Sequence, residues 1–150
     1  MPYSNAWRAF RQASHVRVLT GEKLDLLVEF LPFLSNGAVD LMQPDICFAG
    51  GLTGLWRIAQ LADLHHVPLT AHNIGSALQD AATAHFAAAT PNFVMSETGM
   101  TAGSWRHDII EQKMEIRSGA IRIPDGPGLG VTVREDELRR RLAEGEPWWD

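Results

Sequence analysis

The sequence has little of what secreted, membrane-spanning or nucleic-acid-binding proteins need. It contains a single cysteine, Cys47, which excludes an internal disulfide and is typical of a reducing compartment. No run approaches the roughly 18 consecutive apolar residues of a membrane-spanning helix. The first residues show no basic segment followed by an apolar one. We therefore expect no secretory signal and a cytoplasmic location.

Basic residues are also few. Lys and Arg number 13 against 18 Asp and Glu, so the formal net charge is −5, and there is no basic run. This charge argues against non-specific binding to nucleic acid. A length of 150 residues with 45% hydrophobic residues is typical of one soluble domain with its own core. We expect neither a nucleic-acid nor a membrane partner.

What the sequence does have is four short apolar runs that each end in a carboxylate or a histidine. The terminal residues are Glu22, Asp45, His72 and Glu97, and the steps between them are 23, 27 and 25 residues. A βαβ unit needs roughly 30 residues, so this recurrence predicts parallel βα units. Because parallel strands end on one face of a sheet, the four side chains are predicted to gather there.

Helices are expected between these runs, where apolar residues recur with helical period. The expected helices cover residues 4–14, 23–35, 55–65 and 75–89. Pro32 should kink or divide the second, which Asn36-Gly37 ends. After Glu97 the pattern predicts a loop over 98–107, a hairpin turning at Ser118-Gly119, a Pro/Gly-rich strap over 124–130 and a polar helix over 136–142.

The joint arrangement of these side chains carries more weight than any one of them. Adjacent parallel strands lie about 4.8 Å apart, which puts Asp45 and His72 within hydrogen-bond reach. A carboxylate on one imidazole nitrogen fixes the tautomer and raises the basicity of the other nitrogen, making an acid/base dyad. Glu22 is an oxygen ligand suited to a hard cation. Taken singly, each residue has a structural alternative: a surface charge for Glu22 or Glu97, a turn cap for Asp45, a hydrogen-bonded structural role for His72. Cys47 is expected to be a small buried thiol.

An ordered set of motifs runs along nearly the whole chain. It comprises Thr20-Gly21-Glu22, Gly37-Ala38-Val39-Asp40, Gln43-Pro44-Asp45, Gly50-Gly51-Leu52-Thr53, Ala71-His72, the alanine-rich segment 81–89, Glu97 and Pro124-Asp125-Gly126-Pro127-Gly128-Leu129-Gly130. This set resembles the C-terminal half of the mandelate racemase/muconate lactonizing enzyme branch of the enolase superfamily.

The resemblance implies an α/β fold, namely the C-terminal half of a TIM-like (β/α)₇β barrel with four parallel βα units and a C-terminal strap. Residues 1–110 would hold barrel strands five to eight, and residues 111–150 the hairpin, strap and short helix, without the family's N-terminal capping domain. By the same resemblance Glu22 is a magnesium ligand, Asp45 and His72 are the catalytic dyad, and Glu97 donates to the substrate's developing enolate. Since two further metal ligands and a lysine come from earlier strands in that family, the isolated chain is expected to bind magnesium weakly.

The activity implied is magnesium-dependent removal of the proton next to a carboxylate. An acid-sugar dehydratase is the favoured interpretation, with a small carboxylate substrate such as an acid sugar or a 2-hydroxy acid. Two alternatives stay open: a racemase or epimerase, and a catalytically inactive truncated fragment or assembly unit. The isolated chain is predicted to form a homo-oligomer or to associate with a missing half-barrel, because an open sheet exposes backbone edges.

Overall fold

The computed structural model describes residues 2–99 and 105–149. Four short strands make one sheet: β1 (Leu19–Thr20), β2 (Leu41–Met42), β3 (Leu69–Ala71) and β4 (Phe93–Ser96). They lie in the order β1-β2-β3-β4, and every neighbouring pair is parallel. The predicted set of parallel strands is therefore confirmed.

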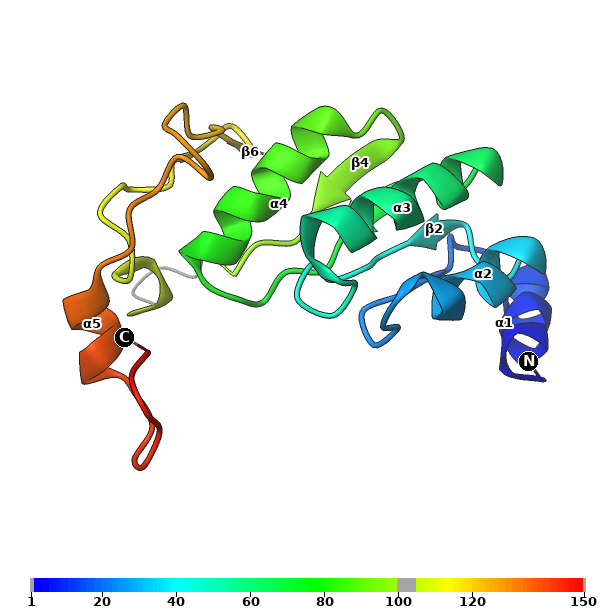
Figure 1. The fold of residues 1–150 in the computed structure, drawn as a ribbon. Coiled ribbons are helices and arrows are strands. Elements are labelled where there is room, and N and C mark those ends of the chain that lie inside the picture. Colours follow the sequence, from blue (N-terminus) through cyan, green and yellow to red (C-terminus); the bar gives the residue numbers. More distant parts are fainter. Residues whose placement is uncertain (1, 100–104, 150) are drawn as a thin grey trace.

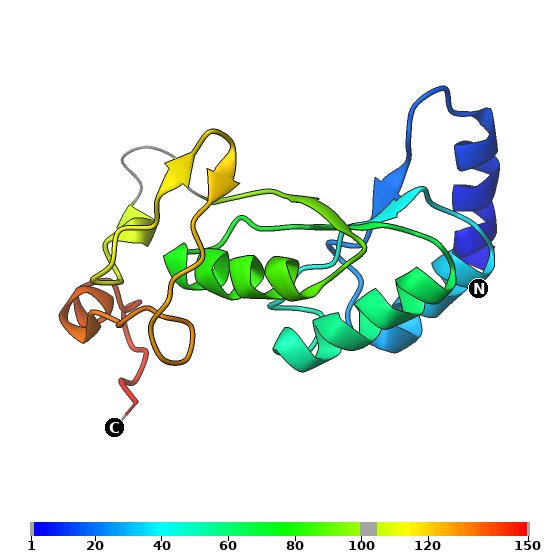
Figure 2. The same ribbon diagram turned by 90° about the horizontal axis from the view of Figure 1, so that it is seen from above.

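Helices cover one face of this sheet. The helices between strands are α2 (Leu27–Ser35), α3 (Gly51–Leu64) and α4 (Ala77–Ala89), and α1 (Pro2–Ala13) precedes the first strand. Both α3 and α4 lie on the same side of the strands (Figures 1 and 2). The main core fills the space between these helices and the sheet, and its fully enclosed side chains include Phe30, Met42, Leu55, Ile58 and Leu69. Burial of these side chains is the main force that holds the layer together.

The second helix begins later than predicted, and its proline does not divide it. It begins at Leu27 rather than at residue 23, because the chain first makes a turn in which the Leu24 N–H donates to the Gly21 carbonyl over 3.1 Å. It continues through Pro32 without dividing, and the Pro32 carbonyl accepts from the Asn36 N–H over 3.2 Å. The predicted stop is confirmed, with Gly37 at a φ of 57° just after the cap.

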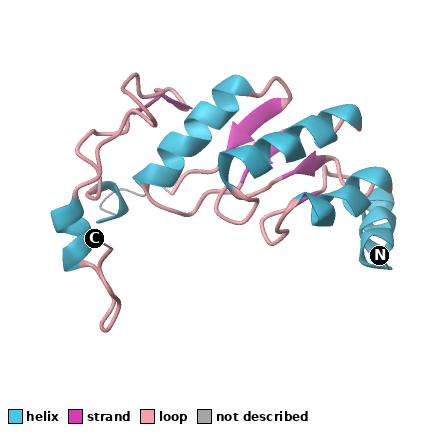
Figure 3. Ribbon diagram, viewed as in Figure 1, coloured by secondary structure: helices cyan, strands magenta, loops and turns pink. Residues whose placement is uncertain are grey.

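The described residues beyond β4 form a mostly irregular arm (Figure 3). The predicted hairpin is confirmed as β5 (Ile116–Arg117) paired with β6 (Ala120–Ile121), and both turn residues, Ser118 and Gly119, have positive φ. A 3-10 turn, η1 (Trp105–His107), lies within the predicted loop, of which residues 100–104 are outside the described ranges. The last helix, α5 (Glu135–Arg140), is close to its prediction. The division at residue 110 stays a prediction.

Both outer strands of the sheet, β1 and β4, have an unpaired edge within the described residues. Large apolar side chains on them are exposed: Leu19 at 42%, Val94 at 51% and Met95 at 64%. An open strand edge with exposed apolar neighbours is a template for pairing with further chain. None of the helices in the described ranges combines the length and apolar character that a bilayer crossing requires.

Candidate active site at the strand ends

The four predicted residues all lie just beyond the carboxyl ends of their strands. Asp45 and His72 form an isolated parallel bridge that continues the β2–β3 ladder. The Glu97 N–H donates to the Ala71 carbonyl over 3.0 Å, which continues the ladder from β3 to β4 in the same way. Regular strand pairing therefore extends into the site and fixes the backbone on which these side chains stand.

The centre of the site is a buried histidine–aspartate pair. His72 Nδ1 lies 2.7 Å from Asp45 Oδ2, and the two side chains are only 6% and 3% exposed. The predicted contact is confirmed. Because an ionised carboxylate accepts a hydrogen bond and cannot donate one, Nδ1 carries the hydrogen whenever Asp45 is ionised. His72 Nε2 is then the ring nitrogen that faces the open side of the site.

Two glutamates approach that second nitrogen from the outer strands. Glu22 Oε2 lies 3.2 Å from His72 Nε2, and Glu97 Oε2 lies 3.9 Å from it. Their side chains are 45% and 48% exposed, unlike the buried pair. The contact to Glu22 spans a whole intervening strand, since β1 pairs with β2 and not with β3. The site thus has a buried centre on β2 and β3 and a solvated carboxylate on each side.

The other oxygen of the Asp45 carboxylate, Oδ1, is also hydrogen-bonded. It accepts from the Cys47 N–H over 2.7 Å and from Gln79 Nε2 over 3.1 Å. The bond to Cys47 is the turn-capping role that was the structural alternative for Asp45, so one side chain fills both roles.

The prediction of a buried thiol at Cys47 is wrong, because the residue is exposed. Partial desolvation, with the nearby Asp45 carboxylate, raises the pKa of this thiol.

A glycine lets the first two strand ends come close. Gly21 has a φ of 142°, a value that side-chain-bearing residues rarely adopt. A Cβ at this position would lie 2.9 Å from backbone atoms of Gln43 on the next strand. Only glycine allows this close approach, which directly precedes Glu22 in the chain.

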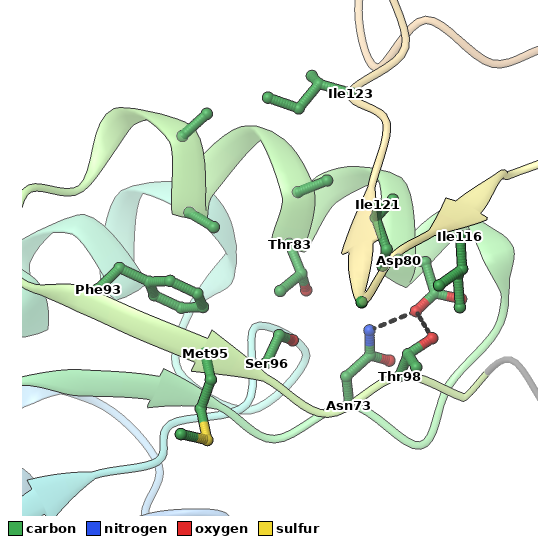
Figure 4. Close-up of a pocket in the computed structure, with 14 residues that line it drawn as sticks. Asn73, Asp80, Thr83, Phe93, Met95, Ser96, Thr98, Ile116, Ile121 and Ile123 are labelled. Carbon is green, nitrogen blue, oxygen red and sulfur yellow. Dashed lines mark hydrogen bonds between the residues drawn. The ribbon is translucent and has the colours of Figure 1, made fainter.

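A hollow of about 450 Å³ lies beside the site between α4, β4 and the β5–β6 hairpin (Figure 4). At its inner end the fully buried Asp80 accepts from Asn73 Nδ2 over 2.8 Å and from the Thr98 hydroxyl over 2.9 Å, both on Oδ1. Burial raises the pKa of Asp80, an effect that these two bonds partly offset. Through these contacts α4 fastens the residue after His72 and the residue after Glu97.

The residues present do not by themselves fit a magnesium ion. Within residues 2–99 and 105–149, no group of three or more His, Cys, Asp or Glu side chains is placed to hold a metal. Magnesium favours near-octahedral oxygen coordination, of which the Glu22 carboxylate supplies a minor part. The chemistry that these residues can perform by themselves is proton transfer at His72 Nε2 and hydrogen bonding by the two glutamates.

Comparison with known proteins decides the family. The profile described as "Enolase C-terminal domain-like" matches residues 2–137. The chain belongs to the enolase C-terminal domain-like family. Its four strands are the C-terminal portion of the TIM-like barrel found in solved members of the enolase superfamily.

Individual relatives in the enolase superfamily have several activities. The chain is 33% identical over 139 residues to D-gluconate dehydratase of Thermoproteus tenax, and 35% identical over 142 residues to D-galactarolactone cycloisomerase of Agrobacterium fabrum. These alignments cover 92% and 89% of this chain but only 28% and 38% of the relatives. A mandelate racemase/muconate lactonizing enzyme-like protein from Rubrobacter xylanophilus superimposes with a TM-score of 0.84 at 30% identity, over 96% of this chain and 37% of that one. The chain spans about a third of the length of these relatives.

Gln79 and Asp80 are site residues that the strand-end pattern did not reveal. They lie on the first turn of α4, outside the strands, and contact the site from behind. One signal for them is present in the sequence: a Gln-Asp pair stands in a helix otherwise dominated by alanine. Both side chains are buried, at 8% and 0% exposure, although polar residues on a surface helix usually face solvent.

Proposed function

We propose that this chain carries the acid–base portion of an enolase-superfamily active site that removes the proton next to a carboxylate, in an acid-sugar dehydratase. The observation that carries the proposal is the Asp45–His72 pair, with Nδ1 held at 2.7 Å and Nε2 facing the open side of the site. The likeness to D-gluconate dehydratase supports an acid sugar as the substrate class.

The proposal assigns a role to each of these residues. In the dehydration, the bond between hydrogen and the carbon next to the carboxylate breaks, and its electrons form a carbon–carbon double bond. The C–O bond on the adjacent carbon breaks, the leaving hydroxyl takes a proton and departs as water, and the enol becomes a 2-keto acid. His72 Nε2 is the atom that exchanges a proton, while Asp45 holds the ring and stabilises its charged form. We assign to Glu97, in its protonated form, a hydrogen bond to the substrate carboxylate as the enolate develops.

Dehydration suits the described residues better than racemisation does. A racemase that uses proton transfer needs one group on each face of the substrate carbon. In the parts of the chain that the structure describes, His72 is the imidazole in contact with the strand-end carboxylates. In dehydration the same imidazole can take one proton and give one to the leaving hydroxyl. A racemase or epimerase, which the likeness to the mandelate racemase/muconate lactonizing enzyme-like structure favours, would take its second base from outside this chain.

We further propose that turnover requires the remaining parts of the barrel, in the same polypeptide or in a partner. The exposed surface supports this. It amounts to 9317 Å², whereas a compact chain of this mass exposes roughly 7,600 Å². The excess of about 1,700 Å² is roughly twice the area of about 800 Å² that one partner buries in a standard protein–protein interface. Open edges on β1 and β4 and exposed Val94 and Met95 are where such a contact would form.

A graft tests the proposal. The barrel portion matched by this chain in D-gluconate dehydratase is replaced by this chain, and the product 2-keto acid is measured with magnesium and a panel of acid sugars. The His72→Ala variant of the graft should lose about 10²–10⁴-fold in turnover and in α-proton exchange with deuterated water, the usual contribution of a general acid/base. His85→Ala is the matched control, because His85 contacts the Leu129 carbonyl and lies outside the site.

Each result of the graft has a clear meaning. A folded graft that exchanges the α-proton equally well with and without His72 would refute its role as the base. Isomerised acid product without loss of water would instead support the racemase alternative. A folded graft that binds magnesium and neither exchanges protons nor forms product would favour the inactive fragment.

A further inference from the structure

The side chain of Gln79 reaches from the first turn of α4 to both members of the dyad. Its Nε2 lies 3.1 Å from Asp45 Oδ1 and 3.5 Å from the His72 carbonyl oxygen. Gln79 is 8% exposed, so this amide group is almost removed from water. Buried amide groups are nearly always hydrogen-bonded, and here both acceptors belong to the dyad.

The chain leaves a place for this side chain. A Cβ added at Gly75 would lie 1.8 Å from Gln79 Oε1 and 2.8 Å from its Cδ. The Gln79 amide therefore occupies the space that a side chain at position 75 would fill. This observation is independent of the hydrogen bonds, and it indicates a side chain held in one position.

Asp45 needs this contact because of how its oxygens are shared. Oδ2 faces His72 Nδ1, and the orientation of the carboxylate depends on what holds Oδ1. The Cys47 N–H is one donor, and Gln79 Nε2 is the other. With Gln79 in place three groups hold the carboxylate, two on Oδ1 and His72 on Oδ2. Without Gln79 a single partner remains on each oxygen, so the carboxylate is held less firmly. Bonds to an ionised acceptor are also stronger than neutral ones.

We propose that Gln79 is a positioning residue that fixes the Asp45 carboxylate and, through it, the ring of His72. Its importance for turnover rests on the proposed function, but the geometric claim does not. The imidazole also meets Glu22 and Glu97 at Nε2, and these half-exposed side chains leave the orientation of the ring to Asp45.

Three variants of the full chain separate the amide from the rest of the helix. Gln79→Met removes the donor and keeps the length and shape of the side chain. Gly75→Ala displaces the Gln79 amide without changing Gln79. Thr83→Val is the matched control, one turn further along α4, because the Thr83 hydroxyl is buried and has no hydrogen-bond partner among the described residues.

The readout is the His72 Nδ1 proton, observed by nuclear magnetic resonance at one fixed pH, and its rate of exchange with water. We expect exchange in the Gln79→Met and Gly75→Ala variants to be about tenfold faster, the ratio typical of one lost hydrogen bond to a charged group. The double variant should exchange no faster than either single variant, because both changes remove the same contact. The Thr83→Val variant should stay within about twofold of the wild type.

Exchange in Gln79→Met at the wild-type rate would overturn the inference, and so would an equal acceleration in Thr83→Val, which would show general loosening of α4. Circular dichroism of each variant verifies that α4 is still folded. The measurement does not depend on catalysis. An active graft with an unmoved Nδ1 proton would contradict only this inference, and an inactive graft with the expected exchange rates would contradict only the proposed function.

Discussion

Replacing Asp40 by alanine should loosen the approach to β1, the strand that leads to Glu22. Asp40 Oδ2 accepts from the Val18 N–H over 2.8 Å, and Asp40 Oδ1 accepts from Arg11 Nε over 2.7 Å. One carboxylate thus fastens both the segment before β1 and helix α1. The Asp40→Ala variant removes both contacts and leaves the Val18 N–H without its acceptor.

The size of the effect follows from these two contacts. Loss of the acceptor for a part-buried backbone N–H costs about 1–2 kcal/mol. The ion pair adds less, about 0.5 kcal/mol, because the Arg11 and Asp40 side chains are 39% and 25% exposed and water screens them. We expect the free energy of unfolding to fall by about 2 kcal/mol in total. The exposed pair of Arg122 and Asp125, at 74% and 83% exposure, is the control, and Asp125→Ala should cost less than about 0.5 kcal/mol.

The effect should depend on pH with a definite sign. The Val18 N–H and the Arg11 guanidinium hold the pKa of Asp40 below its usual value. A group whose pKa is lowered in the folded state contributes its stability above the unfolded pKa, about 3.9, and loses it as the pH falls through the folded value. The difference between wild type and Asp40→Ala should therefore be full near neutral pH and shrink below about pH 4.

Urea unfolding followed by circular dichroism measures these free energies. It should be done at one low protein concentration, since association adds apparent stability. Equal losses for Asp40→Ala and Asp125→Ala would refute the reasoning. A loss for Asp40→Ala that is the same at about pH 7 and at about pH 3 would show that the charge of Asp40 is irrelevant.

Three further outcomes are expected. Burial raises the pKa of Asp80, so the contribution of this residue to stability is lost as the pH rises. Thermal melts should show the Asp80→Asn variant to be at least as stable as the wild type near neutral pH, and the difference should close in acid. The isolated chain should bind magnesium weakly and show no turnover, and tight one-to-one binding by calorimetry to a monomer would contradict this. The chain should self-associate in sedimentation experiments, and Met95→Lys on β4 should weaken that association; a sharply melting, dilute monomer would contradict the open-edge account.

Much of the site could be predicted because it lies where the sequence pattern is simplest. Each strand ends at an abrupt change from apolar to polar residues, and parallel strands bring those ends together. The contact of Asp45 with His72 follows directly from neighbouring strands. Helix boundaries were less predictable. The apolar stripe that includes Leu24 and Leu27 continues across a turn, because apolar spacing indicates which residues are buried and not which backbone groups are hydrogen-bonded.

The contacts between elements that are not neighbouring strands could not be predicted. Glu22 reaches His72 past an intervening strand, and such a distance does not follow from spacing along the chain. Gln79 and Asp80 belong to a helix, where local pattern shows which face is buried but not which strand that face meets. Such contacts depend on how elements pack, and packing is not recorded in the spacing of apolar residues.

The two half-exposed glutamates stand on the two strands whose edges are open. A strand added at either edge would therefore change the surroundings of Glu22 or Glu97 before it changed those of the buried pair. Binding at the site and pairing at the edges are then thermodynamically linked: if edge pairing changes the affinity of the site for a ligand, that ligand changes the affinity of edge pairing by the same factor. Ligand affinity measured across a range of protein concentrations would give that coupling energy directly.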